Sequence, residues 1–277
     1  MEGQTFIHPL ADVAPGAELG ERVRIGPFCH VGADVVLGDD VELVANVTVI
    51  GATSIGAGTK VYPQAALGAP PQNLRHKGGR TTLRIGANCI VREGVTMHTG
   101  SDGSRGETVI GDNGNFFAYC HVAHDCLIGR NASLANGALL AGHCELGDYV
   151  NVGGLTALHQ FVRVGDYAFL SGMSAVLGDV VPFGMVAGNR ATLRGMNVVG
   201  MRRAGFGRSD VQTLRLAYRR IFDRQHPLAD NLARARAEFA GVPLVEKVIA
   251  FMDGRDKRPF CLPPVGRSID DGADDED

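Results

Sequence analysis

The stretch CHVAHDC, residues 120 to 126, places two histidines, two cysteines and an aspartate within seven positions. Imidazole, thiolate and carboxylate groups are the usual protein ligands of zinc. A histidine whose pKa lies near neutral pH can equally act as a general base. Seven residues do not decide between these two chemistries, so the choice depends on the elements that hold the side chains.

A six-residue repeat of apolar side chains runs through the first two thirds of the chain. Every sixth residue from Ile7 to Leu67 is aliphatic, and the count resumes at Ile85 and again at Ile110, ending at Val176. None of these 26 positions is polar, and glycine follows many of them. A helix or an alternating strand does not give this period, whereas a parallel β-helix with three hexapeptides per coil does. We therefore predict a triangular β-helix with these residues inside and the glycines relieving the backbone at its corners.

Residues 18 apart in such a coil lie one above the other, about 4.8 Å apart. This rule places Gly142 above His124 and His143 above Asp125. It also gathers several polar side chains along one edge of the prism, which we call the histidine strip: His121, His124, Asp125, His143, His159 and Gln160. A cluster of titratable groups of this kind is typical of a functional site.

His98 falls outside the strip in this count. The second interruption of the repeat, HTGSDGSRGET, shifts the register and places His98 below Phe117, one face away. Because the flat sides of coiled parallel strands tend to be covered by oligomerisation, we expect a homotrimer. A cleft between subunits would then bring His98 and the loop at 69–80 of a neighbour against the strip.

A zinc site is the competing interpretation of the strip. His121 and His124 are three residues apart on extended chain, which does not present them as a chelate, and Cys126 stacks under Cys144 as buried thiols do without metal. The sequence therefore favours a base and no metal. A zinc lyase and a non-catalytic scaffold with surface histidines remain alternatives.

Helical patterns replace the repeat beyond residue 190. In SDVQTLRLAYRRIFD, Ser209 and Gln212 have the spacing of a capping box at a helix start. LADNLARARAEFAG and PLVEKVIAFMDG predict two further helices. Nine arginines but only two acids lie between residues 190 and 224, a charge balance that would attract an acidic partner.

The domain organisation follows from these patterns. We predict a β-helix over 1–190 with loop excursions near 69–84 and 98–108, a helical region over 191–268 and an acidic, disordered tail over 269–277. The start lacks the features of a signal peptide, and no apolar run is long enough to span a membrane. Six cysteines without CxxC pairs indicate reduced thiols of a cytoplasmic protein.

The chain resembles the UDP-N-acetylglucosamine O-acyltransferases of lipid A synthesis, a family of left-handed β-helix acyltransferases. The resemblance runs nearly end to end and is carried by IHPLADVAPGAELG, QNLRHKG, VTMHTGS, HVAHDC, LANGALLAGH, GGLTALHQFVRVG and GNRATLRGMNVVGMRRAGF. The hexapeptide repeat identifies only the superfamily, whereas HVAHDC, LAGH and HQF at these separations are specific to the family. The related N-acyltransferase carries a separate domain before its repeats, which here begin at residue 7.

The resemblance implies the transfer of an (R)-3-hydroxyacyl chain from acyl carrier protein to the 3-hydroxyl of UDP-N-acetylglucosamine. It implies His124 as the general base with Asp125 beside it, and the Gly142 N–H as the donor to the oxyanion. It implies no cofactor apart from the phosphopantetheine of the carrier protein, and no nucleic-acid partner. The basic helices would dock the acidic carrier protein.

The resemblance also implies further site residues. Those expected to contact the sugar nucleotide are Asn73, His98, His121, His143, His159, Gln160, Asn197 and Arg203. Gly172 matches the position that limits acyl chain length, with Leu170 and Met173 as its neighbours.

Three positions depart from the family pattern. The family often has Asp where this chain has Asn73, Glu where it has Val199, and a second arginine where it has Ala204. Some members acylate a 3-amino sugar nucleotide, and the first departure leaves that acceptor open here. The other two concern the contacts to uridine.

Overall fold

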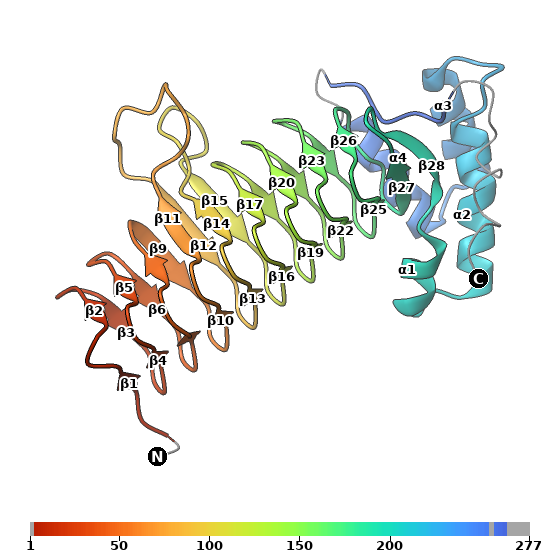
Figure 1. The fold of residues 1–277 in the computed structure, drawn as a ribbon. Helices are drawn as coiled ribbons and strands as arrows, with labels where there is room; N and C mark the ends of the chain where they lie inside the picture. Colours follow the sequence, from red (N-terminus) through yellow and green to blue (C-terminus); the bar gives the residue numbers. More distant parts are fainter. Residues whose placement is uncertain (1–2, 255–257, 265–277) are drawn as a thin grey trace.

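The computed structural model describes residues 3–254 and 258–264, so the predicted acidic tail at 269–277 lies outside the described residues. Figure 1 shows a prism of stacked coils with helices at its C-terminal end. Three parallel sheets form the walls of the prism, as the repeat predicts.

Strands of the three walls follow one another along the chain, so each wall takes every third strand up to β26. The first face consists of β1 (Phe6–Ile7), β4 (Arg24–Ile25), β7 (Glu42–Leu43), β10 (Lys60–Val61), β13 (Ile90–Val91), β16 (Asn115–Phe116), β19 (Ser133–Leu134), β22 (Asn151–Val152), β25 (Phe169–Leu170), β27 (Gly184–Ala187) and β28 (Thr192–Met196). The second face consists of β2 (Asp12–Val13), β5 (His30–Val31), β8 (Thr48–Val49), β11 (Ala66–Ala69), β14 (Thr96–His98), β17 (His121–Val122), β20 (Leu139–Leu140), β23 (Ala157–Leu158) and β26 (Ala175–Val176). The third face consists of β3 (Glu18–Leu19), β6 (Val36–Leu37), β9 (Ala52–Ile55), β12 (Thr82–Ile85), β15 (Glu107–Ile110), β18 (Leu127–Ile128), β21 (Glu145–Leu146) and β24 (Arg163–Val164).

Each strand from β1 to β26 carries one of the repeat positions, and the prediction that these residues point inward is confirmed. From Ile25 to Val176 all of them are buried, with at most 4% of their surface exposed. Only Ile7, Val13 and Leu19 in the first coil are more exposed, because no coil lies beneath them. A continuous aliphatic core therefore runs along the prism axis.

The expected role of the repeat glycines is wrong in one respect. The residue with positive φ at most corners is not the glycine that follows the inward residue but the residue two positions after that glycine, as at Arg22 (φ 56°) and Phe28 (φ 59°). The glycines serve the close approach of successive coils instead. A Cβ on Gly20, for example, would lie 2.7 Å from the backbone nitrogen of Asp39 in the next coil.

Two coils are longer than 18 residues because the excursions leave the prism there. Leu67 pairs with Met97, 30 residues on, and Met97 pairs with Val122, 25 residues on. The whole second excursion therefore leaves at one corner, between β14 and β15, and the chain takes one step around the prism from Met97 to Ile110. Counting two steps there placed His98 below Phe117, and that prediction is wrong.

The C-terminal region caps the last coils. β27 continues the first face in parallel, β28 turns back antiparallel to it, and four helices follow: α1 (Val198–Arg203), α2 (Arg208–Ile221), α3 (Leu228–Glu238) and α4 (Pro243–Asp253). α2, α3 and α4 occur where helical spacing predicted them, whereas α1 was not predicted. None of the described helices is long and apolar enough to cross a membrane.

The predicted capping box of α2 is wrong by two residues. The helix begins at Arg208 after an N-cap at Gly207, whose N–H donates to the Asp210 carboxylate at 2.9 Å. Ser209 therefore lies inside the first turn. The carboxylate of Asp210 satisfies a free N–H at the helix start and also interacts favourably with the helix dipole.

Leu134→Ala tests the aliphatic core. Leu134 is fully buried in β19, so its loss should lower the free energy of unfolding by about 2–5 kcal/mol through lost burial and a cavity. The matched variant Ser133→Ala changes the outward side chain of the same strand and should cost less than about 0.5 kcal/mol. Equal losses in chemical denaturation would contradict the inward and outward assignment.

Candidate functional site

The histidine strip lies on the edge between the second and third faces. Position 123 lies below 141 and 159 in successive coils, as the pairing of β17 with β20 and of β20 with β23 fixes it. The predicted stacking of Gly142 over His124 is confirmed: a Cβ on Gly142 would lie 2.6 Å from Cε1 of the His124 ring. Only glycine leaves room at this position for the imidazole.

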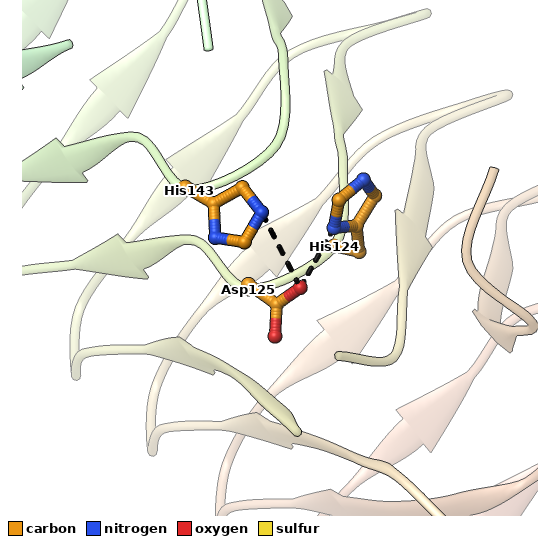
Figure 2. A group of neighbouring side chains, drawn as sticks. All are labelled: His124, Asp125 and His143. Atoms are coloured by element: carbon orange, nitrogen blue, oxygen red, sulfur yellow. Dashed lines mark hydrogen bonds and ion pairs between the residues drawn. The ribbon is translucent and has the colours of Figure 1, made fainter. Parts of the chain in front are cut away.

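Asp125 and His124 form a hydrogen-bonded pair at the base of the strip. His124 Nδ1 lies 2.7 Å from Asp125 Oδ2, and the carboxylate is fully buried while the imidazole is 12% exposed. Figure 2 shows the carboxylate between the rings of His124 and His143. Burial alone would raise the pKa of Asp125, but hydrogen bonds from Ser101 and His124 outweigh it and hold that pKa below its ordinary value.

The ionised carboxylate fixes the tautomer of His124. Because a carboxylate only accepts hydrogen bonds, Nδ1 must carry the proton and Nε2 keeps its lone pair. Above the ring, the backbone N–H of Gly142 makes no hydrogen bond within the described residues. An unprotonated imidazole nitrogen and an unused N–H therefore lie next to each other, an arrangement suited to proton removal beside a developing oxyanion.

His143 lies one coil above Asp125. Its ring stacks on Phe161 with centroids 4.3 Å apart and meets His124 edge-on at 5.1 Å. Burial lowers its pKa, although the charge of Asp125, 3.9 Å from Nε2, acts in the opposite direction. His143 is therefore held beside the base by these ring contacts and by the hydroxyl of Ser104, 3.3 Å from its Nδ1.

His98 belongs to the strip within its own chain, contrary to the sequence-based prediction. Its ring meets that of His121 edge-on at 5.0 Å, and His121 Nδ1 is hydrogen-bonded to Thr96 Oγ1 at 2.8 Å. Burial, followed by the neighbouring His121 and His124, lowers the pKa of His98 to about 4, and burial also lowers the pKa of His121. Among the described residues His98 Nδ1 is buried without a hydrogen-bond partner, which marks it as a group that a ligand could satisfy.

Three side chains of the strip are close enough to hold a metal ion. Atoms of His124, Asp125 and His143 lie within 4.8 Å of one another. Both carboxylate oxygens of Asp125, however, already accept hydrogen bonds: Oδ1 from the N–H groups of Ser101 and Gly106, and Oδ2 from Ser101 Oγ and His124. A metal on Asp125 would have to displace these donors, so the arrangement fits a hydrogen-bonded base better than a zinc site.

A cavity of about 520 Å³ opens over the strip. The predicted residues lining it are His121, His124, Gly142, His159 and Gln160. Gln72 from the first excursion also lines it and was not identified from the sequence, because the loop has no periodicity that orients its side chains. Its neighbour Asn73 instead accepts a hydrogen bond from the N–H of Arg75 at 3.0 Å and so holds a turn of the loop.

Asn197 and Arg203 lie away from the strip. They line a cavity of about 630 Å³ between α1 and the first face, together with Tyr149 and Tyr167 at the edge between the third and first faces. Asn197 accepts from Gly200 N and donates to Tyr167 O, so its side chain caps α1. The departures Val199 and Ala204 line the same cavity.

Gly172 lies on the edge between the first and second faces, where Met173 is 77% exposed. Leu170 is fully buried inside the prism. Of the three residues predicted around the chain-length position, Leu170 therefore contributes to the core and has no surface to offer a ligand beside Gly172.

His98→Gln tests the electrostatics of the strip. The pKa of His98 is about 4 in the folded protein, whereas the ordinary value of about 6.5 applies to the unfolded chain. Between these two pH values the unfolded chain binds more protons, so the free energy of unfolding falls as the pH is lowered from about 6.5 to about 4. Between pH 7 and pH 5, the variant should lose roughly 2 kcal/mol less stability than the starting protein in urea unfolding. Parallel losses in both proteins would show that His98 is not held neutral.

Comparisons with known proteins agree with this geometry. The C-terminal part, residues 179–261, matches a family model described as UDP N-acetylglucosamine O-acyltransferase, domain 2, and residues 16–51 match that of bacterial transferase hexapeptide repeats. The chain is 60% identical to an acyl-[acyl-carrier-protein]–UDP-N-acetylglucosamine O-acyltransferase of Mesorhizobium japonicum, covering 100% of this chain and 99% of that one. It is 48% identical to the protein of the same name from Brucella ovis, covering 99% of both chains.

A solved structure extends the comparison to the fold. The UDP-N-acetylglucosamine acyltransferase from Campylobacter jejuni is 39% identical and superimposes with a TM-score of 0.88, over 94% of this chain and 100% of that one. Identity of this extent over whole chains, together with the prism, the strip and the capping helices, shows that this chain belongs to the UDP-N-acetylglucosamine O-acyltransferase family.

Proposed function

We propose that this protein transfers an (R)-3-hydroxyacyl chain from acyl carrier protein to the 3-hydroxyl of UDP-N-acetylglucosamine. The observation that carries the proposal is the His124–Asp125 pair directly beneath the unused N–H of Gly142. The names of the full-length relatives support the same donor and acceptor. The six described cysteines are all buried free thiols, which supports a cytoplasmic location.

In the proposed reaction, His124 Nε2 takes the proton of the sugar 3-hydroxyl as its oxygen attacks the thioester carbon. The resulting oxyanion accepts a hydrogen bond from the Gly142 N–H. When the intermediate collapses, the carbon–sulfur bond breaks and the departing thiolate of the phosphopantetheine takes from His124 the proton that came from the sugar hydroxyl. Asp125 stabilises the imidazolium between these two steps and keeps its ring in place.

An apolar path across the second face supports an acyl substrate. The outward positions that pair in successive coils are Leu139 on β20, Ala157 on β23 and Ala175 on β26. They lie between the strip on one edge of this face and Gly172 on the other. An acyl chain attached at the strip would lie over these apolar side chains, and Gly172 and Met173 would meet its far end.

We infer that the nucleotide contacts come from more than one copy of the chain. The strip and the cavity that holds Asn197 and Arg203 lie on different edges of the prism, and no described residue lines both cavities. A homotrimer packed along the prism walls would bring the strip of one subunit towards this cavity of its neighbour. We therefore propose that each active site lies between two subunits.

The basic helices are the proposed docking surface for the carrier protein. Arg202, Arg208 and Arg215 line one cavity of about 560 Å³ at the junction of α1 and α2. A cluster of arginines would steer an acidic protein and the phosphate of its prosthetic group.

His124→Ala tests the proposed base. Without an acceptor for the hydroxyl proton, kcat for transfer from acyl carrier protein should fall by about 10²–10⁴-fold, with the fold intact by circular dichroism. His226→Ala removes an exposed histidine between α2 and α3 and should retain activity. Substantial turnover by His124→Ala would refute the mechanism. Running the assay with the 3-amino sugar nucleotide as well identifies the acceptor.

Gly142→Ala tests the stacking of the oxyanion donor on the base. The added Cβ would lie 2.6–2.7 Å from two atoms of the His124 ring, which must then move, so kcat should fall by about 10²-fold or more. Gly32→Ala is the matched control, since its Cβ on the same edge would meet no atom closer than 3.4 Å. Full activity of Gly142→Ala would contradict the proposed placement of ring and donor.

A further inference from the structure

The second excursion surrounds the carboxylate of Asp125 with hydrogen-bond donors. Ser101 contributes its N–H, 3.1 Å from Oδ1, and its hydroxyl, 2.5 Å from Oδ2. Gly106 adds its N–H at 3.0 Å from Oδ1. Ser101 is fully buried, so water does not compete for these contacts.

The hydroxyl of Ser101 and the ring of His124 bind the same oxygen. His124 Nδ1 lies 2.7 Å from Oδ2, the atom that Ser101 Oγ also contacts. Since the ionised carboxylate offers no proton, Ser101 must donate its hydroxyl hydrogen. The hydroxyl of the serine therefore orients Oδ2. It also partly neutralises the negative charge of the Asp125 carboxylate, which weakens the attraction between that charge and the imidazole.

The residues that follow Ser101 are themselves held by contacts with the rest of the site. The next residue, Asp102, accepts hydrogen bonds from the N–H groups of Lys77 and Gly79 in the first excursion and pairs with His76 at 2.6 Å. Further along the excursion, Arg105 donates to the backbone oxygen of Asp125. The second excursion thus connects the first excursion, on which Gln72 lies, with the His124–Asp125 pair.

We propose that Ser101 is a positioning residue for acyl transfer, acting on His124 through Oδ2 of Asp125. Its hydroxyl keeps the carboxylate in the orientation that directs His124 Nε2 into the cavity over the strip. The inference rests on the proposed function, because only a reaction that uses His124 as a base makes this orientation matter. No residue of the second excursion other than His98 was expected at the site from the sequence.

Ser101→Ala should lower kcat by about ten- to hundredfold while KM for UDP-N-acetylglucosamine changes little, since Ser101 does not line the cavity. The carboxylate, with one donor fewer, would stabilise the imidazolium more strongly. The acidic limb of the pH profile of kcat should therefore move to higher pH. The other charged or titratable groups facing the pair stay in place: His98, His121, His143, Arg105 and Glu145.

A double-mutant cycle separates positioning from a merely structural role. In the Asp125→Asn background, Ser101→Ala should cause no further loss of kcat, because the oxygen through which it acts is already changed. Ser101→Thr retains the hydroxyl and should recover most of the rate. Ser101→Cys keeps the volume but donates weakly, so it should behave like Ser101→Ala and serves if the alanine variant does not fold.

Thr99→Val is the matched control within the excursion. It removes a buried hydroxyl that bonds Thr81 and not Asp125, and should leave kcat and its pH profile as they were. Unchanged kcat in folded Ser101→Ala and Ser101→Cys, or losses that multiply with Asp125→Asn, would overturn the proposal. Absence of acyl transfer by the starting protein and by Thr99→Val would instead refute the proposed function.

Discussion

The parallel hydrogen bonding between successive coils is the constraint on which the site depends. The N–H of His143 donates to the carbonyl of His124 at 3.0 Å, and that of Ala123 donates to Leu140 at 3.0 Å, so each coil is held at a fixed height over the last. Inward aliphatic residues such as Val122 and Leu140 lock the same register from inside. The vertical order of donor over base is therefore a property of the backbone and not of a mobile loop.

Asp125 lies in a regular coil of the prism, but its carboxylate contacts the second excursion. It occupies a corner position with positive φ, which turns its carboxylate towards the second excursion. That excursion supplies three donors to the carboxylate, and the first excursion braces it through Asp102. The second excursion thus supplies the hydrogen bonds that the buried Asp125 carboxylate needs. An unpaired carboxylate at this depth would cost several kcal/mol.

The β-helix could be predicted from sequence because an aliphatic residue at every sixth position indicates one arrangement, in which that residue points into a coil of three hexapeptides. The stacking of Gly142 over His124 followed from counting alone. The count failed at His98, since the length of an insertion does not say at which corner the chain leaves the prism. For the same reason Gln72 and Ser101, which lie on the two excursions, carried no signal of their role in the sequence.

Local rules also failed where a competing contact decided the outcome. Ser209 has the spacing of a helix cap, yet Asp210 bonds the N–H of Gly207 and starts α2 earlier. The repeat glycines looked like corner residues, although the close approach of neighbouring coils is what requires them. For α2 the competing interaction is a second local cap, three residues apart like the predicted one. For the glycines it involves a partner in another coil, which residue type and spacing do not specify.

A crystal structure of the protein with bound acylated UDP-N-acetylglucosamine would test the central claim most directly. The account predicts that the 3-oxygen of the sugar lies within about 3.2 Å of His124 Nε2 and that the acyl carbonyl oxygen lies within about 3.1 Å of the Gly142 nitrogen. It also predicts the uridine in the cavity of Asn197 and Arg203 of a neighbouring subunit. An acyl ester seated away from His124, with its carbonyl oxygen on another donor, would contradict it.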